Sequence, residues 1–215
     1  CELINQYKFD KVAYNNYYTL VRRGNMSIID DIEADQMNME FTKKGLRPIF
    51  HVSEKANLVI IGQAPGLRVQ NSGIMWDDAS GDRLREWIGV GKDTFYNSGK
   101  IGVIPMDFYY PGKGKWGDLP PRRGVANKWH PKLLELMPDV QLIILVGSYA
   151  QKYYLNLGYQ SKITDVIKNY KNYLPLYFPI VHPSPRNNIW IKKNPWFEQE
   201  VVPELKEIIS KILSD

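Results

Sequence analysis

Two short stretches of this chain combine residue types that can bind a ligand or move a proton. The first is the corner Gly62-Gln63-Ala64-Pro65-Gly66, and the second runs from His182 through Pro183, Ser184, Pro185 and Arg186 to Asn187. Histidine can donate or accept a proton near neutral pH, and a Gly-rich corner exposes backbone N–H groups that suit an anion or a carbonyl oxygen. These two stretches are therefore the first candidates for a functional site.

Each stretch directly follows a short apolar run that reads as a strand. Leu58–Ile61 precedes the first corner, and Tyr177–Val181 precedes His182. Runs of this length, rich in β-branched residues and bounded by turn residues, are typical of buried parallel strands. Ligand sites in open parallel sheets lie beyond the carboxyl ends of the strands. We therefore expect both corners to contribute to a single cleft.

The segment after the first corner, residues 67–80, is too polar and irregular to predict a helix or a strand. It carries Trp76 beside two carboxylates, Asp77 and Asp78. A large aromatic residue next to carboxylates at the mouth of a parallel sheet indicates an active-site wall. The alternative is a tryptophan buried in the core, which is common for this residue type.

Residues 111–124 form a long segment without periodicity, and such segments are usually functional or disordered. Its cations outnumber its one acidic residue, Asp118, and it also contains Trp116. Positive charge interleaved with an aromatic residue suits a nucleic-acid backbone and its bases, whereas an ordinary solvated loop is an equally weighted alternative. The candidate DNA-binding cations of this segment are Lys113, Lys115, Arg122 and Arg123.

The remaining pattern alternates strands with helices. Further strands are expected at 101–106 and 142–146, and helices at 82–88, 131–137, 148–154, 163–170 and 198–213, with Ser148 as an N-cap. This order predicts a three-layer α/β/α sandwich around a central, mostly parallel four-stranded sheet. We expect residues 1–215 to form a single domain. Within it, residues 1–57 would be a helical extension packed on the rest, with an aromatic stripe from Tyr14 to Val21.

Composition limits the cofactors and the compartment. The formal charge of +5 permits a polyanionic partner. A single cysteine, Cys1, cannot ligate an iron–sulfur cluster, and three histidines make a zinc centre a poor expectation, so we predict neither metal nor cofactor. No apolar run reaches the ~20 residues of a membrane span, and no basic-then-apolar leader opens the chain. We expect a cytoplasmic monomer that does not bind membranes.

Taken together, the motifs resemble the uracil-DNA glycosylase superfamily. Gly62 to Gly66 match its Gly-x-x-Pro-(Gly/Tyr) motif, and His182-Pro183-Ser184-Pro185 match its late His-Pro-Ser-Pro loop. Residues 72–81 look like the segment with the base-stacking aromatic, and residues 106–112 and 117–122 are similar to a bacterial glycosylase-like branch. The resemblance extends from about residue 57 to the end of the chain.

The resemblance implies a DNA glycosylase that hydrolyses the N-glycosidic bond of a flipped-out damaged or deaminated base, uracil or a relative, without a metal. Trp76 would stack on the base, and His182 would donate a hydrogen bond to the base oxygen where negative charge develops. The corner Gly62-Gln63-Ala64-Pro65-Gly66 would contact the base. Pro183, Ser184, Pro185 and Arg186 would contact the DNA backbone.

The water-activating residue is where this sequence departs from the family. The best-known branch has an aspartate where this chain has Ala64, and another branch has a carboxylate where it has Gln63, which can position a water but not deprotonate it. We favour Asp78 for this role, with Asp107 second. Asp107 also falls near the position of a base-reading asparagine. The iron–sulfur branch is excluded because its four cysteines have no counterparts.

Two other functions remain open from the sequence. The first is a nucleic-acid-binding protein that keeps the base pocket but has lost hydrolysis, which Gln63 and Ala64 favour. The second is a hydrolase or transferase of free nucleotides, because a Gly-rich corner after a strand also suits phosphate. That alternative lacks the lysine and hydroxyl of a Walker loop and ranks last.

Overall fold

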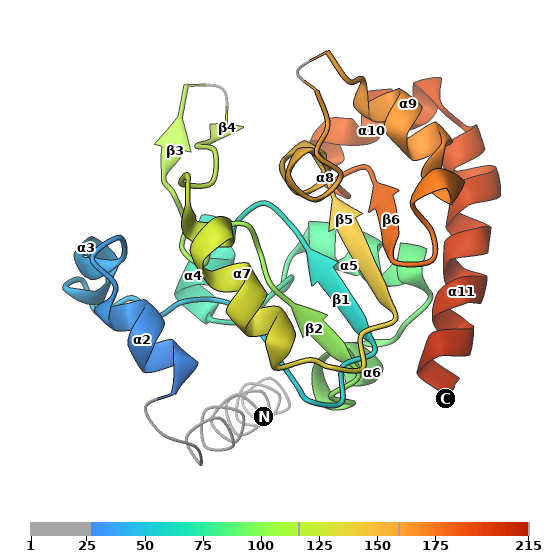
Figure 1. The fold of residues 1–215 in the computed structure, drawn as a ribbon. Helices are drawn as coiled ribbons and strands as arrows, with labels where there is room; N and C mark the ends of the chain where they lie inside the picture. The colour runs from blue at the N-terminus through green and yellow to red at the C-terminus, as the bar shows by residue number, and fades with distance from the viewer. Residues whose placement is uncertain (1–26, 116, 159, 215) are drawn as a thin grey trace, which may run out of the picture. The chain divides into compact units, whose positions relative to one another are not determined.

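A computed structural model describes residues 27–115, 117–158 and 160–214 of the chain (Figure 1). The chain divides into two compact units, the first ending at Pro48 and the second running from Ile49 to Asp215. The aromatic stripe predicted from Tyr14 to Val21 lies outside the described residues.

The described part of the first unit contains two short helices. Helix α2 (Ile28–Ala34) begins with a capping box. The Ser27 side chain accepts the Asp30 backbone N–H, and the Asp30 carboxylate accepts the Ser27 backbone N–H at 3.2 Å. Helix α3 (Met39–Thr42) follows, and the Asn38 side-chain amide donates 2.8 Å to the carbonyl of Ile32. This bond ties the two helices together.

The second unit is built on a four-stranded sheet in the order β2-β1-β5-β6, with every neighbouring pair parallel. The strands are β1 (Leu58–Ile61), β2 (Ile101–Val103), β5 (Leu142–Val146) and β6 (Tyr177–Ile180). Ile60 stands between Val103 and Ile144 in the register. The predicted α/β sandwich with a four-stranded sheet is therefore confirmed, and the sheet is parallel throughout.

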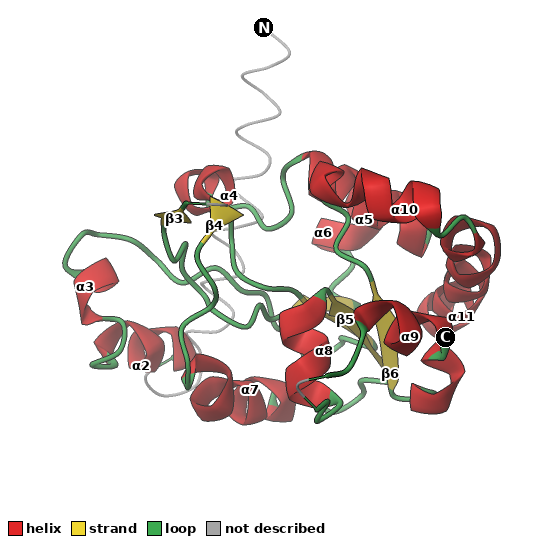
Figure 2. Ribbon diagram, turned by 90° about the horizontal axis from the view of Figure 1, so that it is seen from above, coloured by secondary structure: helices red, strands yellow, loops and turns green. Residues whose placement is uncertain are grey.

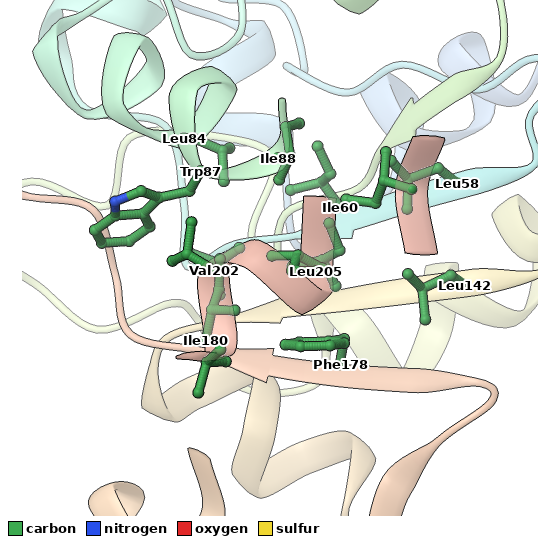
Figure 3. Close-up of a cluster of buried hydrophobic side chains, with 14 of the residues drawn as sticks. Leu58, Ile60, Leu84, Trp87, Ile88, Leu142, Phe178, Ile180, Val202 and Leu205 are labelled. Carbon is green, nitrogen blue, oxygen red and sulfur yellow. The ribbon is translucent and has the colours of Figure 1, made fainter. Parts of the chain in front are cut away.

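Helices cover both faces of this sheet, as Figure 2 shows for α7 and α8 on one side and α5 and α6 on the other. Alternate residues of each strand, such as Leu58 and Ile60, join a core with α5 (Ala79–Ile88) and α11 (Val202–Ser214) (Figure 3). On the opposite face, a Cβ at Gly102 would lie 2.5 Å from the Met137 sulfur, just after α7 (Val125–Glu135). Helix α8 (Ser148–Tyr154) packs on β5.

The other elements of the second unit are short. They are α4 (Leu67–Ser72), α6 (Lys92–Asn97), the hairpin strands β3 (Lys113–Gly114) and β4 (Gly117–Asp118), α9 (Ile163–Lys168), the 3-10 turns Tyr170–Tyr173 and Pro185–Asn187, α10 (Asn188–Lys193) and the π turn Phe197–Val201. None of the helices in the described part of the chain has the length and apolar character that a membrane span requires.

Three sequence predictions about helix positions and helix ends were wrong. Residues 67–72 form a helix, which ends where Gly73 takes a left-handed conformation, and so short a helix shows no periodicity. Helix α7 begins at Val125, so Pro131 lies inside it rather than in its first turn. Ser148 is the first residue of α8, and the N-cap is Gly147.

Candidate active site

A cavity of about 700 Å³ lies beyond the carboxyl ends of β1, β5 and β6. Both corners identified from the sequence line it, the first through Gly62 to Gly66 and the second through His182, Ser184 and Arg186. Trp76 and Asp78 line it as well. Two segments about 120 positions apart along the chain therefore meet in one place, because parallel strands deliver their following loops to the same edge of the sheet.

His182 is held in a defined orientation by its own loop. The backbone N–H of Ser184 donates 3.1 Å to the ring Nδ1, and the Asn187 side-chain amide donates 2.8 Å to the His182 carbonyl. Burial lowers the pKa of His182; the charge of Asp78 opposes this shift and the charge of Arg186 adds to it. The ring is thus neutral, and because Nδ1 accepts a hydrogen bond, the proton resides on Nε2. His182 presents a neutral N–H donor.

Trp76 forms a wall of the cavity against this histidine. The two ring centroids are 5.6 Å apart at an angle of 36°. A Cβ at Gly62 would lie 3.0 Å from the indole Cζ2, so the absence of a side chain there lets the indole lie over the end of β1. The indole is partly buried against the core and lines the cavity with the rest of its surface. Trp76 is therefore not enclosed in the core.

Asp78 both caps helix α5 and lines the cavity. It is the N-cap of α5, where its Oδ1 accepts the Gly81 N–H at 2.8 Å. It also lines the cavity, and its charge acts on His182. Among the hydrogen bonds of the described residues, none engages Oδ2. One carboxylate oxygen of Asp78 thus holds the helix, and the other is available to a ligand or a water.

Asp107 has a different environment from the one predicted. Its side chain is 0% exposed, and it does not line the cavity. Its Oδ1 accepts from the Tyr109 N–H at 3.2 Å and from Arg122 Nη2 at 2.7 Å. Its Oδ2 accepts from the Arg122 backbone N–H at 3.0 Å and from Arg122 Nε at 2.8 Å.

With four donors around it, Asp107 has no free oxygen to activate water or to read a base, which argues against both of its predicted roles. Arg122, a predicted DNA-binding cation, directs its Nε and Nη2 donors to this buried carboxylate, which argues against a phosphate contact at those two atoms. The pair instead fastens the two ends of the segment that carries the β3–β4 hairpin. The physical cause is a bidentate fork between arginine and carboxylate, which sequence spacing does not reveal.

Gln63 connects the first corner to that same segment. Its side-chain Nε2 donates 3.3 Å to the carbonyl of Leu119, and the residue lines the cavity together with Ala64, Pro65 and Gly66. The amide oxygen is the remaining polar atom of the side chain, and it can accept a hydrogen bond from a water. Gln63 can therefore orient a water molecule, as the sequence indicates, but cannot remove its proton.

The predicted cations, apart from Arg122, are at the surface. Lys113, Lys115 and Arg123 are exposed. Arg186 is also exposed, and its guanidinium lies against Gly117 of the hairpin, where a Cβ would come within 2.3 Å of Nη1. Arg186 thus reaches from the loop of His182 to the β3–β4 hairpin at the rim of the cavity. The aromatic residue predicted to accompany these cations, Trp116, lies outside the described residues.

The prolines and the serine of the second corner shape the loop. Ser184 caps the turn Pro185–Asn187, its Oγ accepting the Arg186 N–H at 3.3 Å, and the Asn187 N–H donates 2.9 Å to the Ser184 carbonyl. Pro183 is buried and Pro185 is exposed. These bonds give the loop a fixed geometry, and the exposed Pro185 and Arg186 form its outer surface.

Sequence reasoning assigned no role to several cavity residues. Asn187 fixes the His182 carbonyl, a contact that its place five residues later does not predict. Tyr149 lies three residues after the end of β5, so the rule that segments after parallel strands form the site could have identified it. Thr164 and Trp190, which hydrogen-bond each other at 2.9 Å, come from α9 and α10 and carry no sequence signal. In the described part of the chain, no cluster of three His, Cys, Asp or Glu side chains is placed to hold a metal ion.

Comparison with known proteins gives two findings. A solution structure from Methanosarcina acetivorans, described as a "putative Uracil DNA glycosylase", is similar at 17% identity with a TM-score of 0.42, covering 73% of this chain and 93% of that one. The sequence model of the uracil DNA glycosylase superfamily matches residues 49–206, which is well over half of the chain. On this match, the protein belongs to the uracil DNA glycosylase superfamily.

Proposed function

We propose that the protein is a DNA glycosylase that hydrolyses the N-glycosidic bond of a flipped-out damaged or deaminated base, uracil or a related one, in base excision repair. Superfamily membership supports a DNA-glycosylase-like function in general. The observation that carries the finer proposal is that a neutral histidine donor, an indole wall and a carboxylate with a free oxygen line the same cavity.

The cavity has the size and the walls that an extruded base needs. About 700 Å³ falls within the range of small-molecule sites and accommodates a nucleobase with its sugar. A base that leaves the duplex loses the stacking of its neighbours, and the indole of Trp76 would replace part of it. Stacking on one aromatic side chain contributes ~1–3 kcal/mol per base.

His182 would stabilise the departing base. When the N-glycosidic bond breaks, the electron pair leaves with the base, and negative charge gathers on its oxygen. The Nε2–H of a neutral imidazole is a fixed donor for that charge, and the bond from the Ser184 N–H to Nδ1 keeps the ring in the required tautomer. A neutral donor also avoids placing a second cation beside the positively charged sugar.

Asp78 is the carboxylate that we assign to the water. The sugar cation accepts the water oxygen, and the proton released by that water passes to Asp78 Oδ2. Gln63 would orient the water through its amide oxygen. Before it takes this proton, Asp78 is negatively charged, and its charge stabilises the developing sugar cation.

The surface cations would hold the DNA on either side of the cavity mouth. Lys113 and Lys115 belong to the β3–β4 hairpin, whereas Arg186 belongs to the loop of His182 and touches that hairpin. Phosphate contacts from both sides would place the extruded nucleotide over the cavity. Arg123, two residues before α7, would extend the same basic surface.

A nucleic-acid-binding protein without hydrolysis is the second candidate. The favouring observation is that Ala64 has no group to activate water, while one oxygen of Asp78 is occupied by the helix cap. In that case the cavity would bind an extruded base without cleaving it.

A cleavage assay distinguishes the two functions. Labelled duplexes with a single uracil, hypoxanthine, xanthine or alkylated base are incubated with the protein, and abasic sites are then broken with alkali. We expect breaks at one base type, abolished in His182→Ala and reduced in Asp78→Asn. Salt-sensitive binding to the duplex without any breaks would support the binding protein and reject the glycosylase.

A further inference from the structure

We propose that Arg85 is a positioning residue for Trp76, in that its buried guanidinium fixes the backbone of the turn that presents the indole to the cavity. The effect on catalysis rests on the proposed function, whereas the effect on the indole does not. Arg85 lies in α5, nine residues after Trp76, and only 4% of it is exposed. Side chains of a helix lean toward its N-terminus, so Arg85 reaches back toward the start of α5, near Trp76.

The guanidinium contacts the turn directly and through a tyrosine. Arg85 Nη1 donates 3.1 Å to the Trp76 carbonyl and 2.9 Å to the Tyr96 hydroxyl oxygen. The Tyr96 hydroxyl in turn donates 2.9 Å to the Met75 carbonyl. Two consecutive carbonyls of the turn, those of Met75 and Trp76, are therefore held by one hydrogen-bonded network.

Tyr96 remains a donor in this network at any physiological pH. Burial raises the pKa of Tyr96 to about 12, although the neighbouring Arg85 charge opposes the shift. The guanidinium of Arg85 also lies 5.4 Å from the ring centroids of both Phe95 and Tyr96. These aromatic contacts keep the arginine in one place while it binds the carbonyl.

Trp76 needs such support because its backbone is unusual. Its φ of +55° lies in the left-handed region, which side chains with a Cβ rarely adopt. A residue in this conformation persists only where its surroundings hold it there, and such residues gather at functional sites. The strained conformation occurs at the one residue of the turn whose indole faces His182.

The first turn of α5 is shaped to receive the same carbonyl. A Cβ on Gly81 would lie 1.7 Å from the Trp76 oxygen, so any side chain at this position would displace the turn. Gly62 makes the corresponding space under the indole ring. The backbone of Trp76 is thus held by Arg85 and packed closely against Gly81, and its ring occupies the space that Gly62 leaves open.

A purely structural ion pair does not account for the burial of Arg85. Among the residues that the structure describes, its one carboxylate contact is Nη2 to Asp82 Oδ1 at 2.6 Å, and the Asp82 side chain is 68% exposed. Pairing with an exposed carboxylate does not require a buried guanidinium. The inward nitrogen Nη1, by contrast, binds the Trp76 carbonyl directly and the Met75 carbonyl through Tyr96.

The first test follows the indole itself and needs no activity. The protein is labelled with 5-fluorotryptophan, and the fluorine resonance of Trp76 is identified from its absence in Trp76→Phe. We expect Arg85→Gln to shift or broaden this resonance and to leave the resonances of Trp87 and Trp129 in place. Tyr96→Phe, which removes only a hydroxyl, should move it in the same direction by less. An unchanged Trp76 resonance in both variants would overturn the proposal.

The matched control lies two residues away on the same helix. Arg83 donates 2.7 Å to Asn188 and does not contact the turn, so Arg83→Gln removes one cation from α5 without touching the network. We expect it to leave the Trp76 resonance unchanged. A shift as large as that of Arg85→Gln would show a general effect of charge on the helix and would overturn the proposal.

The second test measures coupling to the reaction. In single-turnover base excision, Arg85→Gln should lower the rate by about 10-fold, which corresponds to the lower part of the stacking range for one base. In a Trp76→Ala background, the same substitution should lower the rate little further, because its target is absent. Equal losses in both backgrounds would indicate a merely structural role and contradict the proposal. If the wild-type protein excises no base, the proposed function fails, and the fluorine resonances alone decide whether Arg85 positions Trp76.

Discussion

Replacing Asp107 by asparagine should lower the free energy of unfolding, whereas replacing Asp78 by asparagine should lower the rate of base excision. In Asp107→Asn, the new amide has a single acceptor oxygen facing four donors, and its NH2 group opposes the N–H groups of Arg122. Removing one partner of a buried pair costs ~3–5 kcal/mol. Because the Arg122 side chain is 23% exposed and can be partly solvated, we expect a loss near the lower limit, about 3 kcal/mol.

Asp78→Asn should behave in the opposite way. Asparagine is as good an N-cap as aspartate, so its oxygen can still accept the Gly81 N–H, and the free energy of unfolding should change by less than about 0.5 kcal/mol. The amide cannot take a proton from water, so base excision should fall by about 10²-fold or more.

The assay combines urea unfolding with single-turnover base excision, both at a temperature where each variant is folded. We expect Asp107→Asn to be less stable than the wild type but to excise bases within a few-fold of the wild-type rate. A stable Asp107→Asn variant that has lost excision, or an Asp78→Asn variant with full activity, would refute the assignment of the two carboxylates.

Three other outcomes follow from the structure. Burial lowers the pKa of His130 to about 4 from the 6.5 of an exposed histidine. At a pH between 4 and 6.5, the imidazole therefore binds a proton in the unfolded chain but not in the folded one. Stability should therefore fall as the pH drops from 6.5 to 4, by up to about 3 kcal/mol from this residue, and urea unfolding of His130→Phe should show a shallower pH dependence. Gly62→Val should displace the Trp76 indole, already 3.0 Å from a Cβ at that position, and weaken DNA-dependent excision, whereas unchanged kinetics would show that the indole has room to move. Replacing Lys113 and Lys115 by alanine should weaken DNA binding for all sequences and reduce the slope of log affinity against log salt by about 2, as measured by titrating a labelled duplex at several salt concentrations.

The parts of the fold that the sequence predicts best are those dictated by local pattern. Strands β1 and β5 are continuous apolar runs. The corners after β1 and β6 line one cavity, as predicted from the position of ligand sites beyond the carboxyl ends of parallel strands. Helix α4 escapes prediction because a six-residue helix is too short for a hydrophobic period. Helix α7 is misjudged at its start because Pro131 is tolerated in its interior.

The candidate site is predicted in its residue types but not in its environments. The sequence ranks Asp78 above Asp107 but does not show that Asp107 is buried and paired with Arg122, fifteen residues later, and these contacts decide the difference between the two carboxylates. The tautomer of His182 depends on a bond from its own loop, and the support of Trp76 depends on Arg85 and Tyr96 from two helices. Such contacts arise from tertiary structure and leave no periodic signal.

The role of the cavity in base excision can be tested by a crystal structure of the Asp78→Asn variant bound to DNA that contains the base which the wild-type protein removes. This variant should excise the base slowly, and a 2′-fluoro substituent on the target nucleotide, which disfavours the sugar cation, should keep the N-glycosidic bond intact in the crystal. We expect the base outside the duplex, stacked on Trp76, with a base oxygen within hydrogen-bonding distance of His182 Nε2. A base that remains stacked in the duplex, or one that binds elsewhere while the cavity stays empty, would contradict it.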